Sequence, residues 1–309
     1  MPQSIRQPLT GVFPIAPTPF TESGALDLEG MRRVLDCMVD QGVDGICILA
    51  NYSEQFALSD AERDSLLHLC LEHVAGRVPV IVTVSHYSTR IVCERARQSQ
   101  AAGAAMLMLM PPYHGALLKP DEQGVFEHFE QVAAACDLPL MVQDAPLSGV
   151  ALSVPFLVRM AKEIPQVSYL KVETPNAAAK LRALIAAGGK AIEGPFDGEE
   201  SITLMADLEA GATGTMPSAM IPDLIQPIVY DYLKGDHAAA AAQYNRILPL
   251  INYENRQCNL RATKAVMLEG GVIKSDMTRH PFAPLGDAER KGLLALAREH
   301  NPVALTWGR

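Results

Sequence analysis

The stretch Val167-Ser168-Tyr169-Leu170-Lys171-Val172-Glu173-Thr174-Pro175 has the apolar, β-branched pattern of a buried strand, yet it carries a lysine and a glutamate. Side chains alternate between the two faces of a strand, so Tyr169, Lys171 and Glu173 share one face. Burial penalises the charged form of a lysine and lowers its pKa from about 10.4. We therefore expect Lys171 to be a neutral amine that forms a Schiff base, with Glu173 as its proton carrier. The alternative is a structural ion pair between Lys171 and Glu173 at a strand end.

On both sides of this stretch the chain repeats one unit, an apolar run followed by a polar loop and a helix. Asp27 is expected to cap the first helix, and Ser59 with Glu62 and Asp197 with Glu200 have the spacing of capping boxes. The expected strands, in order, lie at about 11–16, 45–50, 78–84, 105–110, 138–142, 167–173, 191–193 and 211–216. Eight strands alternating with helices predict an α/β fold of the (β/α)8 TIM barrel type rather than a doubly wound sheet.

The length of the chain fits one such barrel with an extension. A barrel needs about 250 residues, and this chain has 309. We assign residues 1–221 to the barrel core and residues 222–309 to the last barrel helix and a C-terminal helical extension of the same structural unit. Additional C-terminal helices of this kind often build an oligomer interface.

Composition and charge narrow the function classes. Hydrophobic residues make up 49% and charged residues 20% of the chain, which is ordinary for a globular enzyme. The net charge of −9 argues against a nucleic-acid partner, whose binders usually carry a basic face. The N-terminal residues lack a signal-peptide pattern, and the longest apolar run, residues 101–110, is about half a membrane span. We expect a cytoplasmic protein with no membrane partner.

Motifs for cofactors and metals are missing from the sequence. The six cysteines form no CxxC pair and show no ligand-like spacing to histidine, so we expect buried free thiols. The chain also contains no GxGxxG, P-loop or zinc-helix motif. We therefore expect no metal and no cofactor beyond a covalent imine through Lys171.

Unusual polar residues follow the expected strands. The loops after the strands of a barrel meet at one face, where active sites form. The candidates at these positions are Asn51, Tyr52, Ser53, Glu54, His86, Tyr113, His114, Gln143, Asp144, Lys171, Glu173, Asp197 and Glu200.

Each candidate also has a structural explanation. Ser53 and Glu54 could simply be polar loop residues that lead into the next helix. A capping box alone would account for Asp197 and Glu200. His86 and His114 have no partner at metal spacing, which favours loop hydrogen bonds over metal ligation. Tyr113, after two prolines, is either a rigidly presented phenol or a packing aromatic.

The order of these pieces resembles the dihydrodipicolinate synthase and N-acetylneuraminate lyase superfamily, over nearly the whole chain. The similar segments are Gly11 to Phe20, Ser53-Glu54, Gly76 to Ile81, Pro111-Pro112-Tyr113, Leu147 to Val150 and Lys171. The resemblance implies a barrel whose sixth strand carries a Schiff-base lysine, here Lys171. It also implies a homo-oligomer, usually a tetramer.

Departures from the superfamily pattern bear on the reaction. Gln143 stands where most members have a proton-carrying tyrosine, and an amide cannot carry that proton. Asn51-Tyr52 replaces the threonine pair of the synthases, and residues 146–149 lack the arginine that grips their second substrate. Dihydrodipicolinate synthesis is therefore not expected.

Four segments, 48–56, 85–89, 142–146 and 193–200, are similar to those of a bacterial dehydratase branch of the superfamily. This similarity implies dehydration of a small molecule, the 2-keto-3-deoxy sugar acid L-2-keto-3-deoxyarabonate, to 2,5-dioxopentanoate (α-ketoglutarate semialdehyde). The implied catalytic residues are Lys171 as electron sink and Glu173 as base, with Gln143 and Tyr113. The implied substrate-binding residues are Asn51, Tyr52, Ser53, His86, Gly194 and Glu200.

The leaving hydroxyl and the reaction class stay open in the sequence. Gln143, His86, Tyr113 and Glu200 are alternative groups to orient or protonate the hydroxyl. The rival reactions are a pyruvate-releasing class I aldolase or lyase and a decarboxylating keto-deoxy-glucarate dehydratase, both of the same superfamily. A non-catalytic sugar-acid sensor is the rival of another class.

Overall fold

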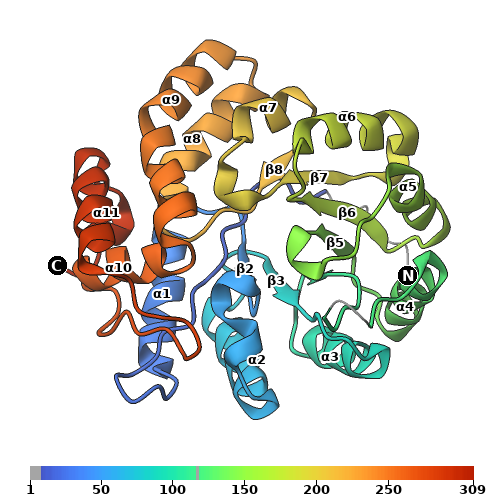
Figure 1. Ribbon diagram of the computed structural model, residues 1–309, viewed down its shortest axis with the longest axis horizontal. Coiled ribbons are helices and arrows are strands. Elements are labelled where there is room, and N and C mark those ends of the chain that lie inside the picture. Colours follow the sequence, from blue (N-terminus) through green and yellow to red (C-terminus); the bar gives the residue numbers. More distant parts are fainter. Residues whose placement is uncertain (1–7, 116–117) are drawn as a thin grey trace.

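Eight parallel strands form the centre of the computed structural model, which describes residues 8–115 and 118–309 (Figure 1). Hydrogen-bonded neighbours follow the order β1-β8-β7-β6-β5-β4-β3-β2. The strands are β1 (Gly11–Val12), β2 (Ile46–Ile48), β3 (Val80–Thr83), β4 (Met106–Leu109), β5 (Leu140–Asp144), β6 (Val167–Val172), β7 (Gly194–Asp197) and β8 (Gly214–Thr215). The expected α/β barrel is confirmed, and all its strand ends point the same way.

The barrel closes just beyond β1. Ile15 makes parallel bridges both to Cys47 in β2 and to Ser218 after β8. The amide of Ala16 donates to the carbonyl oxygen of Cys47 at 2.8 Å, and the amide of Cys47 donates to Pro14 at 2.9 Å. The proline-stiffened segment after Gly11 therefore joins the first and last parts of the sheet.

The helices form an outer layer around the strands (Figure 1). Capping residues mark the helix starts: Asp27 accepts the expected backbone hydrogen bond, and Ser59 with Glu62 forms the expected capping box. Asp121 caps a further helix in the same way. The α-helices of the barrel are α1 (Leu28–Asp40), α2 (Asp60–Val74), α3 (Thr89–Ala101), α4 (Glu122–Ala135), α5 (Val154–Glu163), α6 (Ala177–Gly188), α7 (Leu204–Glu209) and α8 (Pro222–Leu233).

The seventh strand lies later than the sequence pattern predicts. Residues 189–191 form a 3-10 turn, and β7 is Gly194–Asp197 instead of residues 191–193. A glycine and a proline inside the strand hid it, because both residues are normally rare in strands. Gly194 is needed because a Cβ there would lie 2.0 Å from the ring of Tyr169. The prediction placed the strand too early because the need for glycine at position 194 comes from a tertiary contact, which no local sequence pattern reveals.

Two layers of apolar side chains hold the barrel together. Inward-facing residues fill its interior, among them Phe13, Met106, Met141, Tyr169 and Phe196. A larger cluster packs between the strands and the surrounding helices, and it continues into the C-terminal helices. Each fully buried side chain of this size contributes roughly 1.5–3 kcal/mol through its removal from water. The interior of the barrel is thus a packed core, and a cavity inside the barrel can form only at its mouth, where the strands end.

The C-terminal extension consists of α9 (His237–Tyr253), a π-helical turn (Glu254–Cys258), α10 (Arg261–Glu269) and α11 (Asp287–His300). Together with α8 these helices gather on one side of the barrel, in orange and red in Figure 1. The predicted boundary between the barrel core (residues 1–221) and the C-terminal part (residues 222–309) stays a prediction. In the described part of the chain no helix is long and apolar enough to cross a membrane, and the six cysteines are buried free thiols as expected.

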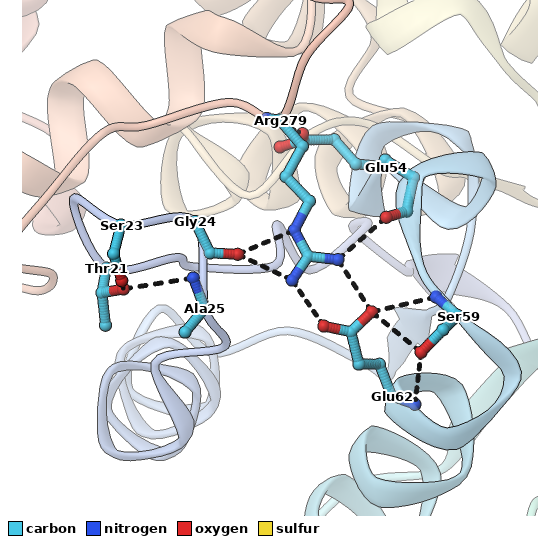
Figure 2. Close-up of polar contacts among 9 residues, drawn as sticks. Thr21, Ser23, Gly24, Ala25, Glu54, Ser59, Glu62 and Arg279 are labelled. Atoms are coloured by element: carbon cyan, nitrogen blue, oxygen red, sulfur yellow. Dashed lines mark hydrogen bonds and ion pairs between the residues drawn. The ribbon is translucent and has the colours of Figure 1, made fainter.

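A buried ion pair attaches the extension to the barrel. Lys264 of α10 contacts the carboxylate of Glu54, and both side chains are fully buried. The backbone amide of Arg279 donates to the other oxygen of Glu54 at 2.9 Å. Figure 2 shows the Arg279 guanidinium between Glu62 and the carbonyl oxygen of Gly24. Glu54, a polar residue of the barrel mouth by sequence, therefore has a structural role.

Candidate active site

Lys171 lies on β6, near the carboxyl end of the strand, and its side chain faces a cavity at the barrel mouth. The residue is 1% exposed. The cavity has a volume of about 170 Å³. Its walls come from several strand ends and the loops that follow them; the lining residues are Ile15, Asn51, Tyr52, Gln143, Ala145, Pro146, Leu147, Lys171, Glu173, Glu199 and Glu200. The structure thus brings Lys171 and Glu173 together with four other predicted site residues.

The electrostatics of Lys171 correct the sequence interpretation. The amine contacts the Glu173 carboxylate directly, as an ion pair. Burial lowers the pKa of Lys171, but the negative charges of Glu173 and Glu200 outweigh burial and raise that pKa above its ordinary value. The expectation of a neutral resting amine was wrong: the charge of Glu173, which the sequence already placed on the same face, and that of Glu200, whose proximity the sequence did not show, together outweigh burial. Lys171 must lose its proton before it attacks a carbonyl, and Glu173 is the acceptor in contact.

Gln143 fixes the position of Glu173. It lies on β5 directly opposite Lys171 in the strand register. Its side-chain amide donates to the same Glu173 oxygen that contacts Lys171, at 3.1 Å. The next residue of β5, Asp144, turns to the outer side and pairs with Lys180 at 2.6 Å. The amide therefore orients the carboxylate of Glu173, and Lys180 pairs with Asp144, the acid of this strand.

Glu200 is a second acid in the cavity wall. It is 6% exposed and has a left-handed backbone, with φ 53°. Burial raises the pKa of Glu200 to about 7, although the positive charge of Lys171 acts in the opposite direction. Tyr52 also lines the wall, and burial together with the negative charge of Glu200 raises the pKa of its phenol. Near neutral pH, Glu200 thus exchanges a proton readily, as a general acid must.

The loop after β2 provides the opposite wall of the cavity. Asn51 lines it and accepts a hydrogen bond from Gln55 at 2.7 Å. Ser53 is buried behind this wall: its hydroxyl donates to the carbonyl oxygen of Ala16 at 2.7 Å and accepts from the amide of Ala50 at 3.1 Å. Ser53 therefore holds the loop in place, and its role as a substrate ligand stays a prediction.

Three other predicted site residues lie outside the Lys171 cavity. His86 and Tyr113 line a separate cavity of about 730 Å³ on the side of β3 and β4. The His86 ring accepts a hydrogen bond from the amide of Ser88 at 2.9 Å, and burial lowers the pKa of His86. Gly194 packs under the ring of Tyr169 inside the barrel. The functional roles of His86, Tyr113 and Gly194 stay predictions, and their positions outside the Lys171 cavity do not support these roles.

The capping box predicted for Asp197 and Glu200 is wrong. Asp197 lies inside β7, and Thr215 of the neighbouring β8 donates a hydrogen bond to its buried carboxyl group. Burial and the negative charge of the equally buried Asp207 raise the pKa of Asp197 well above its ordinary value. Asp197 thus belongs to the strand and not to a helix cap, because the strand extends further than expected.

The sequence interpretation missed Glu254. This residue begins the π-helical turn after α9, far along the chain from the other site residues, and it is 1% exposed. Burial raises the pKa of Glu254 to about 8. An acid inside a helix gives no local signal of function, and only its near-complete burial in the structure singles it out. Among the described residues, no cluster of three or more histidine, cysteine or acidic side chains has the arrangement of a metal site.

The fold and the site together define a class, the (β/α)8-barrel lyases with a buried lysine beside a carboxylate at the mouth. Residues 8–300 match the sequence model of the Dihydrodipicolinate synthetase family, and the chain belongs to that family. Membership of the family confirms the resemblance seen in the sequence.

Individual relatives extend this assignment. The chain is 56% identical over 297 residues to L-2-keto-3-deoxyarabonate dehydratase of Azospirillum brasilense, with 96% of each chain covered. It is 31% identical over 279 residues to 4-hydroxy-tetrahydrodipicolinate synthase 2 of Streptomyces coelicolor, covering 89% of this chain and 90% of the other. Among solved structures, YagE of Escherichia coli K12, in complex with pyruvate, matches with a TM-score of 0.86 at 26% identity over 95% of this chain and 99% of that chain.

Proposed function

We propose that this protein dehydrates L-2-keto-3-deoxyarabonate to 2,5-dioxopentanoate (α-ketoglutarate semialdehyde) and water, through a Schiff base on Lys171. The observation that carries the proposal is the buried contact of the Lys171 amine with Glu173, whose carboxylate Gln143 orients. The dehydratase of A. brasilense, similar over nearly the whole chain, supports this substrate. YagE, solved in complex with pyruvate, supports a 2-keto acid as substrate of this chain, because pyruvate is itself a 2-keto acid.

The residues account for each step of this reaction. Glu173 takes the ammonium proton of Lys171, and the free amine attacks C2 of the substrate. Glu173 then returns this proton to the oxygen on C2, which leaves as water, so Glu173 is a carboxylate again when the iminium has formed. The resulting iminium acidifies the C3 protons, and Glu173 removes one of them. The electron pair then expels the C4 hydroxyl, which leaves as water after it receives a proton. The elimination leaves a C3–C4 double bond conjugated to the iminium, and transfer of a proton from C5 to C3 converts it to the C4–C5 enol. The enol tautomerises to the aldehyde at C5, and hydrolysis of the imine releases the product.

Gln143 supports dehydration over carbon–carbon cleavage. A retro-aldol cleavage of the C3–C4 bond needs a base that removes the proton of the C4 hydroxyl. An amide cannot act as that base, and the amide of Gln143 is already engaged with Glu173. Dehydration instead needs an acid for the departing hydroxyl, and Glu200 in the cavity wall has a pKa of about 7. We assign this role to Glu200, with Asn51 and Tyr52 as substrate-binding residues.

The broader expectations stand as proposals beside this reaction. The chemistry needs no metal or cofactor other than the covalent imine. We propose a homotetramer in the cytoplasm that acts on the pentose-derived acid of L-arabinose degradation. The net charge of −9 and the matching family support a small-molecule substrate rather than a nucleic acid.

Product analysis tests the proposal. Purified protein is given L-2-keto-3-deoxyarabonate, and the products are identified by mass spectrometry and by a semialdehyde-specific reagent. We expect 2,5-dioxopentanoate with all five carbons of the substrate. Pyruvate would instead indicate the aldolase, and carbon dioxide from a six-carbon keto-deoxy-glucarate would indicate the decarboxylating dehydratase. Borohydride treatment with pyruvate that leaves Lys171 unmodified would favour a sugar-acid sensor.

A further inference from the structure

Three consecutive residues at the barrel mouth, Glu199–Ser201, have a backbone conformation that is unfavourable for residues with a side chain. Glu199, Glu200 and Ser201 all lie in the left-handed region, with φ of 50°, 53° and 66°. Non-glycine residues persist in this region only where the surrounding structure holds them, and such strain clusters at active sites. This strained segment brings Glu199 and Glu200 into the wall of the Lys171 cavity.

The glycine before the strained segment shows in which direction the segment can relax. A Cβ on Gly198 would lie 2.4 Å from Cγ of Glu173 and 3.2 Å from Cε of Lys171. The backbone at Gly198 therefore packs directly against the pair of residues proposed to form and deprotonate the imine. A shift toward the cavity would collide with this pair, so the segment can relax only outward. An outward shift would take Glu200 away from a bound substrate.

Hydrogen bonds to the sheet hold one end of the strained segment. The hydroxyl groups of Ser201 and Thr215 on β8 are 2.7 Å apart, and both are buried. Thr215 in turn donates to the carboxyl group of Asp197 on β7. The sheet thus fixes the segment at Ser201, and the end at Glu199 needs support from another part of the fold.

Helix α9 and the turn after it supply this support. The side-chain amide of Asn255 donates to the carbonyl oxygen of Glu199 at 3.4 Å and to a carbonyl oxygen of its own helix at 3.3 Å. Asn255 is 8% exposed, so water cannot readily replace these bonds. The phenol of Tyr244 on α9 donates to the carbonyl oxygen of Ile202, directly after the segment. The C-terminal extension therefore bonds to the backbone on both sides of Glu200.

An irregularity of the helix accompanies the Asn255 contact. The turn Glu254–Cys258 is π-helical, and the amide of Asn259 donates to the Glu254 carbonyl oxygen at 2.7 Å. Such turns are rare and occur frequently at functional sites. Arg256 of the same turn pairs with the Glu199 carboxylate at 3.2 Å, but this ion pair is exposed and contributes little. The buried amide of Asn255 is therefore the main contact of the turn with the strained segment.

We propose that Asn255, assisted by Tyr244, is a positioning residue that holds the strained segment against the cavity and keeps Glu200 directed at the leaving hydroxyl. This role rests on the proposed function, in which Glu200 donates the proton that leaves with the C4 oxygen. Asn255 itself neither contacts the substrate nor transfers a proton. Without it the segment relaxes outward and Glu200 withdraws, whereas Lys171 and Glu173 keep their places on and beside β6.

Asn255→Leu in the intact protein tests this role, because leucine has a similar size and no hydrogen-bond donor. Release of 2,5-dioxopentanoate should slow by at least about tenfold, since a small displacement of a catalytic group is costly. Labelling of Lys171 by pyruvate and borohydride should stay at the wild-type level. The matched control is Gln257→Leu, at an exposed position of the same turn, which should change neither readout. Unchanged product release, or equal losses of release and labelling, would overturn the proposal.

A double-variant cycle shows whether Asn255 acts through Glu200. Glu200→Gln removes the acid and should by itself slow product release by about 10²–10⁴-fold. Adding Asn255→Leu to Glu200→Gln should cause no further loss, because the position of an absent acid has no effect on the rate. Losses that multiply in the double variant would show that Asn255 acts elsewhere and would refute the proposal.

Tyr244→Phe keeps the test decisive if Asn255→Leu fails to fold. It removes only the hydroxyl that donates to Ile202. The ratio of product release to Lys171 labelling should fall, by a smaller factor than in Asn255→Leu, and an unchanged ratio would contradict the support of the segment by α9. Failure of the proposed function is recognised separately, because wild type would then not release 2,5-dioxopentanoate.

Discussion

Glu173→Gln separates imine formation from proton removal. The variant keeps the size of the side chain beside Lys171 and removes its negative charge, which contacts the amine in the wild type. Burial then dominates, so the pKa of Lys171 should fall and the amine should be neutral over a wider pH range. The lost general base should slow dehydration by about 10²–10⁴-fold. This range corresponds to about 2.7–5.5 kcal/mol in activation free energy.

Two assays on the same samples read the two steps. After treatment with pyruvate and borohydride, Lys171 of the variant should still carry the reduced pyruvate adduct, as detected by peptide mass spectrometry. Release of 2,5-dioxopentanoate should fall by the factor given above. Glu209→Gln is the matched control, since Glu209 on α7 has a side chain that is 71% exposed. If the variant dehydrates at the wild-type rate, Glu173 is not the base; if labelling and dehydration are both lost, the two steps were not separate.

Three further changes have defined outcomes. Lys171→Ala should abolish both turnover and borohydride labelling, and a label found on another lysine would contradict the assignment. Lys264→Met should lower the free energy of unfolding by about 3–5 kcal/mol, measured in urea, because it leaves the carboxylate of Glu54 buried and unpaired. The double variant Lys264→Met/Glu54→Gln should regain part of this loss, whereas equal losses would refute the explanation. Burial lowers the pKa of His128 from 6.5 to about 4, so the unfolded chain binds a proton that the folded chain does not. The free energy of unfolding should therefore drop by up to about 3 kcal/mol as the pH falls through this window, and His128→Asn should show a correspondingly smaller drop.

Local patterns were sufficient for much of the architecture. The cap at Asp27 and the capping box of Ser59 with Glu62 act within one helical turn, so the sequence predicts them directly. Strand alternation likewise predicted that Lys171 and Tyr169 share one face of their strand, and the structure shows that this face is the inner one. The box at Asp197 failed because its carboxyl group bonds to Thr215 on the next strand, a partner that depends on register.

The sequence alone determined the order of strands and helices, the barrel class and the lysine at the end of the sixth strand, because side-chain periodicity and capping are local properties of the chain. Only the tertiary structure decided the protonation of that lysine, the position of the seventh strand and the burial of Glu254. These features depend on charges and contacts between residues far apart in the chain. Electrostatic energy depends on distance in space and on burial, and neither quantity can be read from sequence spacing.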